Sequence, residues 1–211
     1  MGNKMQKNIN LRMPIWTSIV VLLSVAAYVV PELYHFFIYD RAAILGGEAW
    51  RLWSSHLVHF NAIHLLYNIL VFGISGWIIE SKGYKHFGLL CILMAFFIGI
   101  FLMLMEPAMS YYGGLSGLAC GSIYYLALFG LSESKFWRRV SLMILLIIPV
   151  KISFEIYNSE SILPYIGKLD FMTMPVSHIF GILVASFLFF TVKVSEKRKN
   201  NPENIIQDAA L

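Results

Sequence analysis

Charged residues are scarce in this chain of 211 residues: 13% are Asp, Glu, Lys or Arg, whereas soluble domains carry about 25%. Apolar side chains make up 58% of the sequence, more than a water-soluble core absorbs. No hydrophilic stretch is long enough to form a separate globule. The sequence therefore predicts one membrane domain, at residues 14–194, between short cytosolic tails at residues 1–13 and 195–211.

Cysteine is also rare. The two cysteines, Cys91 and Cys120, both lie inside apolar runs, so the sequence offers no disulfide framework. The formal net charge of +4 could favour nucleic acid, but the basic residues are spread between apolar runs and form no single patch. We therefore expect contact with a lipid bilayer and no binding of nucleic acid. No run has the alternating pattern of a membrane barrel strand.

The N-terminus resembles a signal peptide, because Lys4, Lys7 and Arg12 precede an apolar run that begins at Pro14. That run is longer than the roughly 20 residues that cross a bilayer, and it lacks a small-x-small cleavage site. An uncleaved first span is the better interpretation. The chain predicts an all-α, polytopic bundle of six transmembrane helices, at about residues 14–35, 56–79, 86–105, 115–131, 138–154 and 175–194.

The basic residues predict the orientation, because Lys and Arg accumulate in cytoplasmic segments. With six spans, 12 of the 16 basic residues fall on one side of the membrane. These are Lys4, Lys7, Arg12, Lys82, Lys85, Lys135, Arg138, Arg139, Lys193, Lys197, Arg198 and Lys199. We therefore expect both termini in the cytosol.

Polar residues suited to chemistry collect near the opposite face. In this topology Ser116 lies at the outer end of the fourth span and His178 in the first turn of the sixth, so the two share one depth. The second span enters from the same side and carries His64 and Asn68. Intramembrane ionisable residues are rare and often functional. The outer face is therefore the expected place of a site.

Small residues recur at four-residue spacing in the fourth and sixth spans: Gly113, Gly117, Gly121, Gly181 and Ala185. Such stripes let two helices pack closely, which would bring the Ser116 hydroxyl to the His178 ring. A histidine, with an ordinary pKa of about 6.5, can take the proton that activates a serine nucleophile. Stripes of this kind are also ordinary packing devices, so the string around Ser116 leaves catalysis and plain packing both open.

An acyl-transfer enzyme also needs donors aimed at the developing oxyanion. The first turn of a helix leaves its amides unpaired, which makes the amides of Leu115, Ser116 and Gly117 candidates. His64 and Asn68, at i and i+4 on one helix face, could add side-chain donors. A lone intramembrane histidine is more often structural, but this pair at the level of a serine and a second histidine favours a site.

Two further kinds of centre are less favoured. His56, His59 and His64 could suggest a metal, but this part of the second span has no His-Glu-x-x-His motif, no carboxylate and no nearby cysteine. We expect neither metal nor cofactor. No Asp or Glu stands out as a third catalytic member, since Asp170 is interpreted as a solvated loop acid. The predicted catalytic unit is a Ser116–His178 dyad.

Together these residues resemble the rhomboid family of intramembrane serine proteases. The resemblance covers about residues 45–195 and runs through Trp50-Arg51, the spacing His59-x4-His64-x3-Asn68, Gly114-Leu115-Ser116-Gly117 and His178-x-x-Gly181. It implies that Ser116 is the nucleophile and His178 the general base, with His64 and Asn68 on the oxyanion side. It also implies a loop-positioning role for Trp50 and Arg51.

The resemblance further implies a multi-pass protein of the bacterial inner membrane, with its site on the outer side and a transmembrane protein as substrate. The compact six-span form, with Lys151 and Glu155 ending the fifth span, is similar to the rhombosortase branch. That branch implies substrates with a C-terminal Gly-Gly, an apolar helix and a basic tail. Lys151 and Glu155 can pair at i, i+4 and reach the outer interface, which favours a structural or substrate-tail role over catalysis.

One position departs from the family pattern. Many rhomboids have a tyrosine four residues after the nucleophile, stacked beneath the catalytic histidine, and here that residue is Cys120. Tyr124 or Tyr125 could help to hold the histidine instead. Other functions also stay open: a general rhomboid protease, a pseudoprotease that binds membrane clients without cutting them, and a transporter. A transporter would need polar residues along a whole pathway, which the apolar third and fifth spans do not supply.

Overall fold

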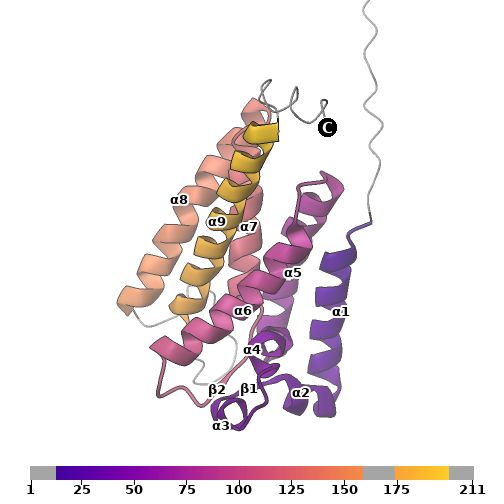
Figure 1. The fold of residues 1–211 in the computed structure, drawn as a ribbon, viewed down its shortest axis with the longest axis vertical. Helices are drawn as coiled ribbons and strands as arrows, with labels where there is room; N and C mark the ends of the chain where they lie inside the picture. The colour runs from indigo at the N-terminus through magenta and orange to yellow at the C-terminus, as the bar shows by residue number, and fades with distance from the viewer. Residues whose placement is uncertain (1–12, 159–173, 200–211) are drawn as a thin grey trace, which may run out of the picture.

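The computed structural model describes residues 13–158 and 174–199, which form a helical bundle with one short pair of strands (Figure 1). The elements are α1 (Ile15–Val29), α2 (Pro31–Phe37), β1 (Tyr39–Asp40), α3 (Arg41–Leu45), α4 (Arg51–Ser54), a 3-10 turn (Ser55–Leu57), α5 (Ala62–Ser81), α6 (Phe87–Met105), β2 (Tyr111–Tyr112), α7 (Ser116–Gly130), α8 (Lys135–Asn158) and α9 (Pro175–Lys199). β1 and β2 pair antiparallel over two residues each. The expected all-α class is confirmed for the described residues.

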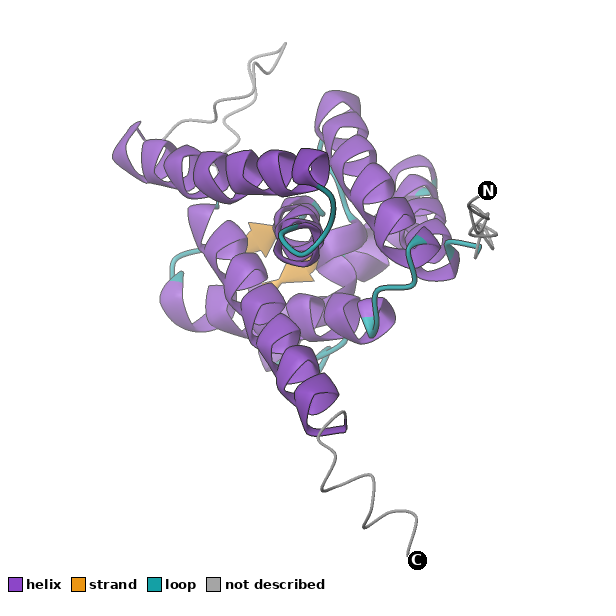
Figure 2. Cartoon of the chain, turned by 90° about the horizontal axis from the view of Figure 1, so that it is seen from above, coloured by secondary structure: helices purple, strands orange, loops and turns teal. Residues whose placement is uncertain are grey.

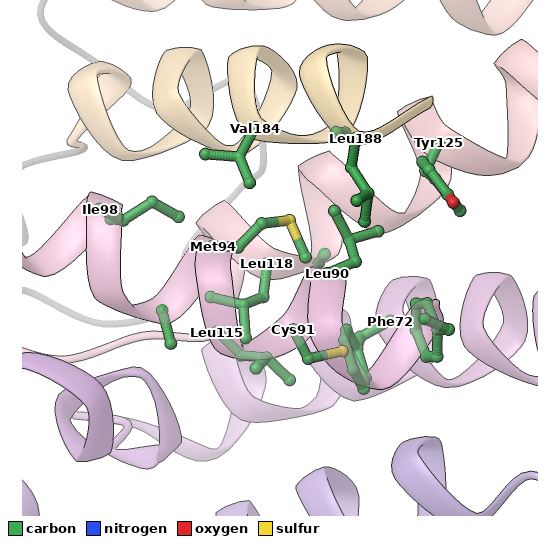
Figure 3. Packing of buried hydrophobic residues seen from close by; sticks show 14 of the residues in the cluster. Phe72, Leu90, Cys91, Met94, Ile98, Leu115, Leu118, Tyr125, Val184 and Leu188 are labelled. Carbon is green, nitrogen blue, oxygen red and sulfur yellow. The ribbon is translucent and has the colours of Figure 1, made fainter. Parts of the chain in front are cut away.

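Helix α7 is the centre of the bundle. It packs against α5, α6, α8 and α9, most extensively against α9, and nearly all of its residues are buried. Viewed along the bundle, one helix is surrounded by the others (Figure 2). Leu118 of α7 packs in the same core as Phe72 of α5, Met94 of α6 and Val184 of α9 (Figure 3). The residues at the start of α7 are therefore enclosed by several helices.

The described helices account for most of the predicted spans. Four of them, α5, α6, α8 and α9, are long and apolar enough to cross a membrane, and the bent pair α1 and α2 could supply a fifth. The predicted fourth span, α7, is apolar but has 15 residues. The outward surface is apolar as well, with more than half of each of these side chains exposed: Leu22, Leu66, Leu104, Leu146 and Phe187. This is the surface of a bundle surrounded by lipid.

The first predicted span, 14–35, is not one continuous helix. α1 ends at Val29, and α2 begins at Pro31 after a bend of 112°. Proline lacks an amide hydrogen and disfavours helical backbone at the residue before it. Val30 is accordingly extended, with φ −102° and ψ 108°. The expectation of an uninterrupted helix is wrong here, and the chain from Pro31 turns aside as α2.

The two ends of the bundle differ in chemistry. At one end of the bundle, ion pairs connect loops and helix ends. The Lys82 ammonium lies 3.1 Å from a Glu133 carboxylate oxygen, and the Lys85 ammonium lies 3.1 Å from a Glu196 carboxylate oxygen. At the same end, Glu80 of α5 accepts a hydrogen bond from the amide of Thr17 at the start of α1. The start of α1 and the ends of α5, α7 and α9 therefore lie together. The other end holds α2, α3, α4 and the strand pair (Figure 1).

Candidate active site

Ser116 begins α7 at the end of the bundle that holds the strands. Its neighbours from Tyr112 to Leu115 and from Gly117 to Ser122 are buried, whereas Ser116 is partly exposed. The first amide that bonds within the helix is that of Ala119, which donates to the Leu115 carbonyl. The amides of Ser116 and Gly117 precede this ladder and lie at the positive end of the helix dipole. A partly exposed hydroxyl thus lies beside amides suited to an anion.

Gly114 shapes the approach to Ser116. Its φ of +152° is a conformation that residues with a side chain rarely adopt, and a Cβ there would lie 2.9 Å from Cε1 of the His64 ring. The same Cβ would lie 4.0 Å from Ser116 Oγ. The His64 ring and the Ser116 hydroxyl therefore border one small space, which the absence of a side chain at Gly114 leaves open.

Backbone contact between α7 and α9 joins the residues that adjoin Ser116 and His178 in the sequence. A Cβ on Gly117 would lie 2.9 Å from the carbonyl oxygen of Ser177, the residue before His178. A Cβ on Gly121 would lie 2.7 Å from the carbonyl oxygen of Gly181, and one on Gly181 would strike the Gly117 carbonyl. Gly117, which follows the serine, and Ser177, which precedes the histidine, are thus in contact across the two helices.

The other two members of the small-residue stripe lie differently. Ala185 is fully buried one turn beyond Gly181 on α9. Gly113 does not face α9, because a Cβ there would lie 3.0 Å from the carbonyl oxygen of Val58, in the segment before α5. The helical spacing does not extend back to Gly113, since α7 begins at Ser116. Its assignment to the α7–α9 stripe is wrong.

A carboxylate lies against His178, although no Asp or Glu stands out in the sequence as a third catalytic member. Glu155 Oε2 of α8 is 3.0 Å from His178 Nδ1. Lys151 Nζ is 2.7 Å from the other carboxylate oxygen and 3.4 Å from His178 Nδ1. The Glu155 side chain is 2% exposed, so it does not reach the interface as expected. Asp170, the loop acid considered from the sequence, lies outside the described residues.

His59 and Asn68 form a hydrogen-bonded support behind the serine. Two donors converge on His59 Nε2: the Leu115 amide at 3.3 Å and Asn68 Nδ2 at 3.1 Å. His59 Nδ1 lies 3.2 Å from the Leu57 carbonyl, so we assign the ring proton to Nδ1. Burial, and secondarily the charge of His64, lowers the pKa of His59 to about 3. His59 is therefore a neutral acceptor that anchors the loop before Ser116.

The Leu115 amide differs from its predicted part in the oxyanion site. It donates to His59 in this structure, so the amides of Ser116 and Gly117 are the better placed donors.

The position of His64 is set by the start of α5. That helix begins at Ala62, and not at residue 56 as predicted. The Asn61 side chain caps the helix by accepting a hydrogen bond from the His64 amide at 2.7 Å.

Tyr112 is a site residue that sequence reasoning missed. Its hydroxyl donates to the Gly114 carbonyl at 3.2 Å and lies beside the hydroxyls of Ser116 and Ser177. Burial raises the pKa of Tyr112 to about 12, although those two hydroxyls oppose the shift. No spacing pattern points to Tyr112, because β2 places it here and a strand of two residues leaves no periodicity to detect.

Trp50 and Arg51 brace the segment between α2 and α4 and lie outside the cluster around Ser116. Arg51 donates at 2.8 Å to the carbonyls of both His35 and Ile38, and it pairs with Glu48 at 2.7 Å. Trp50 stacks on Phe36 with ring centroids 5.2 Å apart. These contacts join α2 to α4 and fix the loop between them.

The position of the missing tyrosine is filled by apolar packing. Cys120 is buried with Ile148 and Ile152 of α8, and Tyr124 lies at the edge of this cluster. Tyr125 is directed to the opposite end of the bundle, where its hydroxyl donates to the Lys85 carbonyl at 2.8 Å. The suggestion that Tyr125 holds the histidine is therefore wrong, and the described contacts of His178 are with Glu155 and Lys151 instead.

The histidines considered as metal ligands have other contacts. His56 Nε2 lies 2.9 Å from the Ala95 carbonyl, and burial lowers the pKa of His56 to about 4. Within residues 13–158 and 174–199, no three His, Cys, Asp or Glu side chains are grouped so as to hold a metal ion. The ring of His56 is therefore held by the backbone of α6.

Comparison with known families gives a match over most of the chain. The family model for the rhomboid domain matches residues 46–194, which include every site residue named above from Trp50 to Ala185. No curated protein matches the chain.

Proposed function

The chain belongs to the rhomboid family, whose members are intramembrane serine proteases, and on that premise we propose that it cleaves a transmembrane protein with Ser116 and His178. His178 Nε2 takes the proton of Ser116 as Oγ attacks the scissile carbonyl. The amides of Ser116 and Gly117, with His64 and the second N–H of the Asn68 amide, receive the negative charge on the carbonyl oxygen. His178 then protonates the leaving amine, and water resolves the acyl-enzyme by the reverse sequence.

The observation that carries this proposal is the contact between Gly117 and Ser177. It places the residues next to Ser116 and His178 against each other, backbone to backbone. A helix pair separated by ordinary side chains would hold its axes about 8–10 Å apart and keep the two functional groups from meeting. Close packing of α7 and α9 beside Ser116 and His178 supports a catalytic pair more than it supports a binding module.

The membrane arrangement we propose has six crossings: α1 with α2, α5, α6, α7, α8 and α9. Both termini then lie in the cytosol, at the end with the lysine-rich contacts, and the site faces the outer side of a bacterial inner membrane. α7, with 15 residues, is about 22 Å long, whereas a bilayer core measures about 30 Å. A short central helix starts below the outer surface, so Ser116 would act inside the membrane.

The finer proposal concerns the substrate. We favour rhombosortase-type processing of proteins that end in Gly-Gly, an apolar helix and a basic tail. The space beside Ser116 is narrow, because the His64 ring closes on Gly114. Small residues would fit there, and they also let a helix unwind and expose its carbonyls to attack. A general rhomboid protease is the alternative within the family.

Labelling with a fluorophosphonate probe tests the function directly. The full-length protein in detergent should bind one probe per chain, and Ser116→Ala and His178→Ala should abolish both labelling and cleavage of a transmembrane substrate. Ser122→Ala is the matched control, because this buried hydroxyl of α7 is used within its own helix, on the Leu118 carbonyl. It should keep both activities.

The same experiment separates the proposal from a pseudoprotease. A non-cleaving binder would retain a membrane client equally well with serine or with alanine at position 116, and no cleaved product would form with either. Cleavage that persists in Ser116→Ala would instead overturn the choice of nucleophile.

A further inference from the structure

Glu155 is a buried charge next to the histidine that serves as base. Its side chain is 2% exposed, and Oε2 lies 3.0 Å from His178 Nδ1. A charge inside a membrane protein is costly unless it is paired, and the charges that occur there tend to be functional. Its i, i+4 partner Lys151 explains the pairing. The ion pair with Lys151 does not explain why the Glu155 carboxylate also contacts a histidine on another helix.

The two carboxylate oxygens have separate partners. Oε1 accepts from Lys151 Nζ at 2.7 Å, and Oε2 faces His178. Lys151 Nζ is 3.4 Å from His178 Nδ1, a longer contact than that of the carboxylate. Lys151 therefore holds one side of the carboxylate and leaves the other to the imidazole.

This arrangement fixes the proton of His178. An Nδ1–H can donate to Glu155, whereas a bare Nδ1 would place its lone pair against a carboxylate oxygen at 3.0 Å. We assign the proton to Nδ1 because the repulsive alternative has only the longer contact with Lys151 to offset it. Nε2 then keeps the lone pair, and it is the nitrogen that can accept the proton of a serine.

The charges around His178 also suit the reaction. When the ring takes the proton of Ser116 it becomes positive, and the Glu155 carboxylate stabilises that charge in a site with little water. At rest the carboxylate is balanced by Lys151, so the pair adds no net charge to the interior. His64, from α5, is a further ionisable side chain that interacts with His178.

From these contacts we infer that Glu155 is a positioning residue of the active site, which orients His178 through its Nδ1–H, and that Lys151 orients Glu155 in turn. The inference rests on the proposed protease function and deepens it: the unit is Ser116–His178–Glu155, and not a dyad. Glu155 touches no reacting atom, and its effect passes through the imidazole.

Glu155→Gln gives a sharp test, because an amide has one acceptor and one donor. Lys151 donates, so it should draw the amide oxygen to its own side and leave the NH₂ group facing His178 Nδ1. The ring must then accept at Nδ1 and carry its proton on Nε2, where it blocks the base. We expect kcat to fall by about 10²-fold or more with KM within about threefold, since in serine protease triads such a replacement costs about 10⁴.

The double variant Glu155→Gln, Lys151→Met distinguishes orientation from simple loss of charge. Without Lys151 the amide can rotate, its oxygen can accept the Nδ1–H, and the productive form of the ring returns. We expect the double variant to recover at least about tenfold in kcat over Glu155→Gln. A purely structural Glu155 predicts no such recovery per folded molecule.

Each rate is measured on full-length protein in detergent, with a transmembrane Gly-Gly substrate, and divided by the fraction that stays folded. Glu80→Gln is the control, because Glu80 is a structural carboxylate that accepts hydrogen bonds at the start of α1, at the far end of the bundle. It should lower the melting temperature and leave kcat of the folded fraction intact.

Two failures can be told apart. If Ser116→Ala abolishes cleavage but Glu155→Gln keeps wild-type kcat, or the double variant is no faster than Glu155→Gln, the inference about Glu155 is overturned and the protease stands. If Ser116→Ala cleaves like the wild type, Ser116 is not the nucleophile, and the proposed Ser116–His178 mechanism is overturned before Glu155 is tested.

Discussion

A Cβ atom on Gly181 would collide with the carbonyl oxygen of Gly117, so the two helices that carry His178 and Ser116 touch through their backbones. One methyl group at this point has no space unless α7 and α9 separate. The distance between the proposed nucleophile and the proposed base then depends on a residue that takes no part in the proposed chemistry.

We expect Gly181→Ala to lower cleavage and probe labelling by about 10²-fold, and Gly181→Leu to abolish both, because a shift of about 1 Å at reacting atoms costs about that much. The control is Gly73→Ala on α5, where a Cβ meets nothing within 4 Å. That variant should keep full activity and be slightly more stable, since alanine favours a helix by up to about 1 kcal/mol over glycine. Normal labelling in Gly181→Leu would show that the contact does not set the site.

The oxyanion side can be tested on His64 and Asn68. Removing one oxyanion donor costs about 10²–10³ in kcat, but backbone amides at Ser116 and Gly117 share the charge here. Asn68→Ala should therefore be slow yet measurable, and His64→Ala slower. Cleavage rates of the two single variants and the double variant give the answer. Full activity in the double variant would remove both residues from the oxyanion site.

Much of the bundle could be predicted because its signals are local. Apolar runs of about 20 residues set α5, α6, α8 and α9, and small residues at four-residue spacing mark the contact of α7 with α9. The break at Pro31 also has a local signal, since proline acts on the residue before it. Hydropathy alone treats the run as one span, which is why it does not predict the bend.

The contacts of Glu155 and Tyr112 could not be predicted. Glu155 lies 23 residues before His178, on a different helix, and meets it only because α8 is rotated to point that carboxylate inward. The spacing of Lys151 and Glu155 already satisfies both charges within one helix, so the pattern gives no reason to seek a third partner. Tyr112 depends on a loop turn at Gly114, which hydropathy does not describe.

His59 should make the protein sensitive to acid. Its pKa is lowered to about 3 in the folded state, whereas an exposed histidine titrates near 6.5. Between these values the unfolded chain binds a proton that the folded chain does not, so stability falls as the pH drops below about 6.5.

His59→Gln keeps an acceptor for the Leu115 amide but cannot titrate. Melting temperatures in detergent at pH 7 and pH 4.5 should therefore differ less for His59→Gln than for the wild type, because all other groups are shared. If the melting temperature falls by the same amount in the two proteins between pH 7 and pH 4.5, the assignment of His59 as a buried neutral acceptor is contradicted.

The substrate can be tested through its own sequence, independently of any change in the enzyme. A cleavage site next to Ser116 must fit beside Gly114 and the His64 ring, where a Cβ on the glycine would already lie 2.9 Å from the ring. Replacing Gly-Gly by Leu-Leu in a transmembrane substrate with a basic cytosolic tail should lower kcat/KM by at least about 10²-fold. The loss has two causes: leucine does not fit in the narrow space, and it strengthens the helix that must unwind. Substitution of apolar residues at mid-helix should change the rate by less than about tenfold, and mass spectrometry of the products locates the cut in each case. Equal cleavage of the Leu-Leu substrate, at the same bond, would favour a general rhomboid protease over rhombosortase-type specificity.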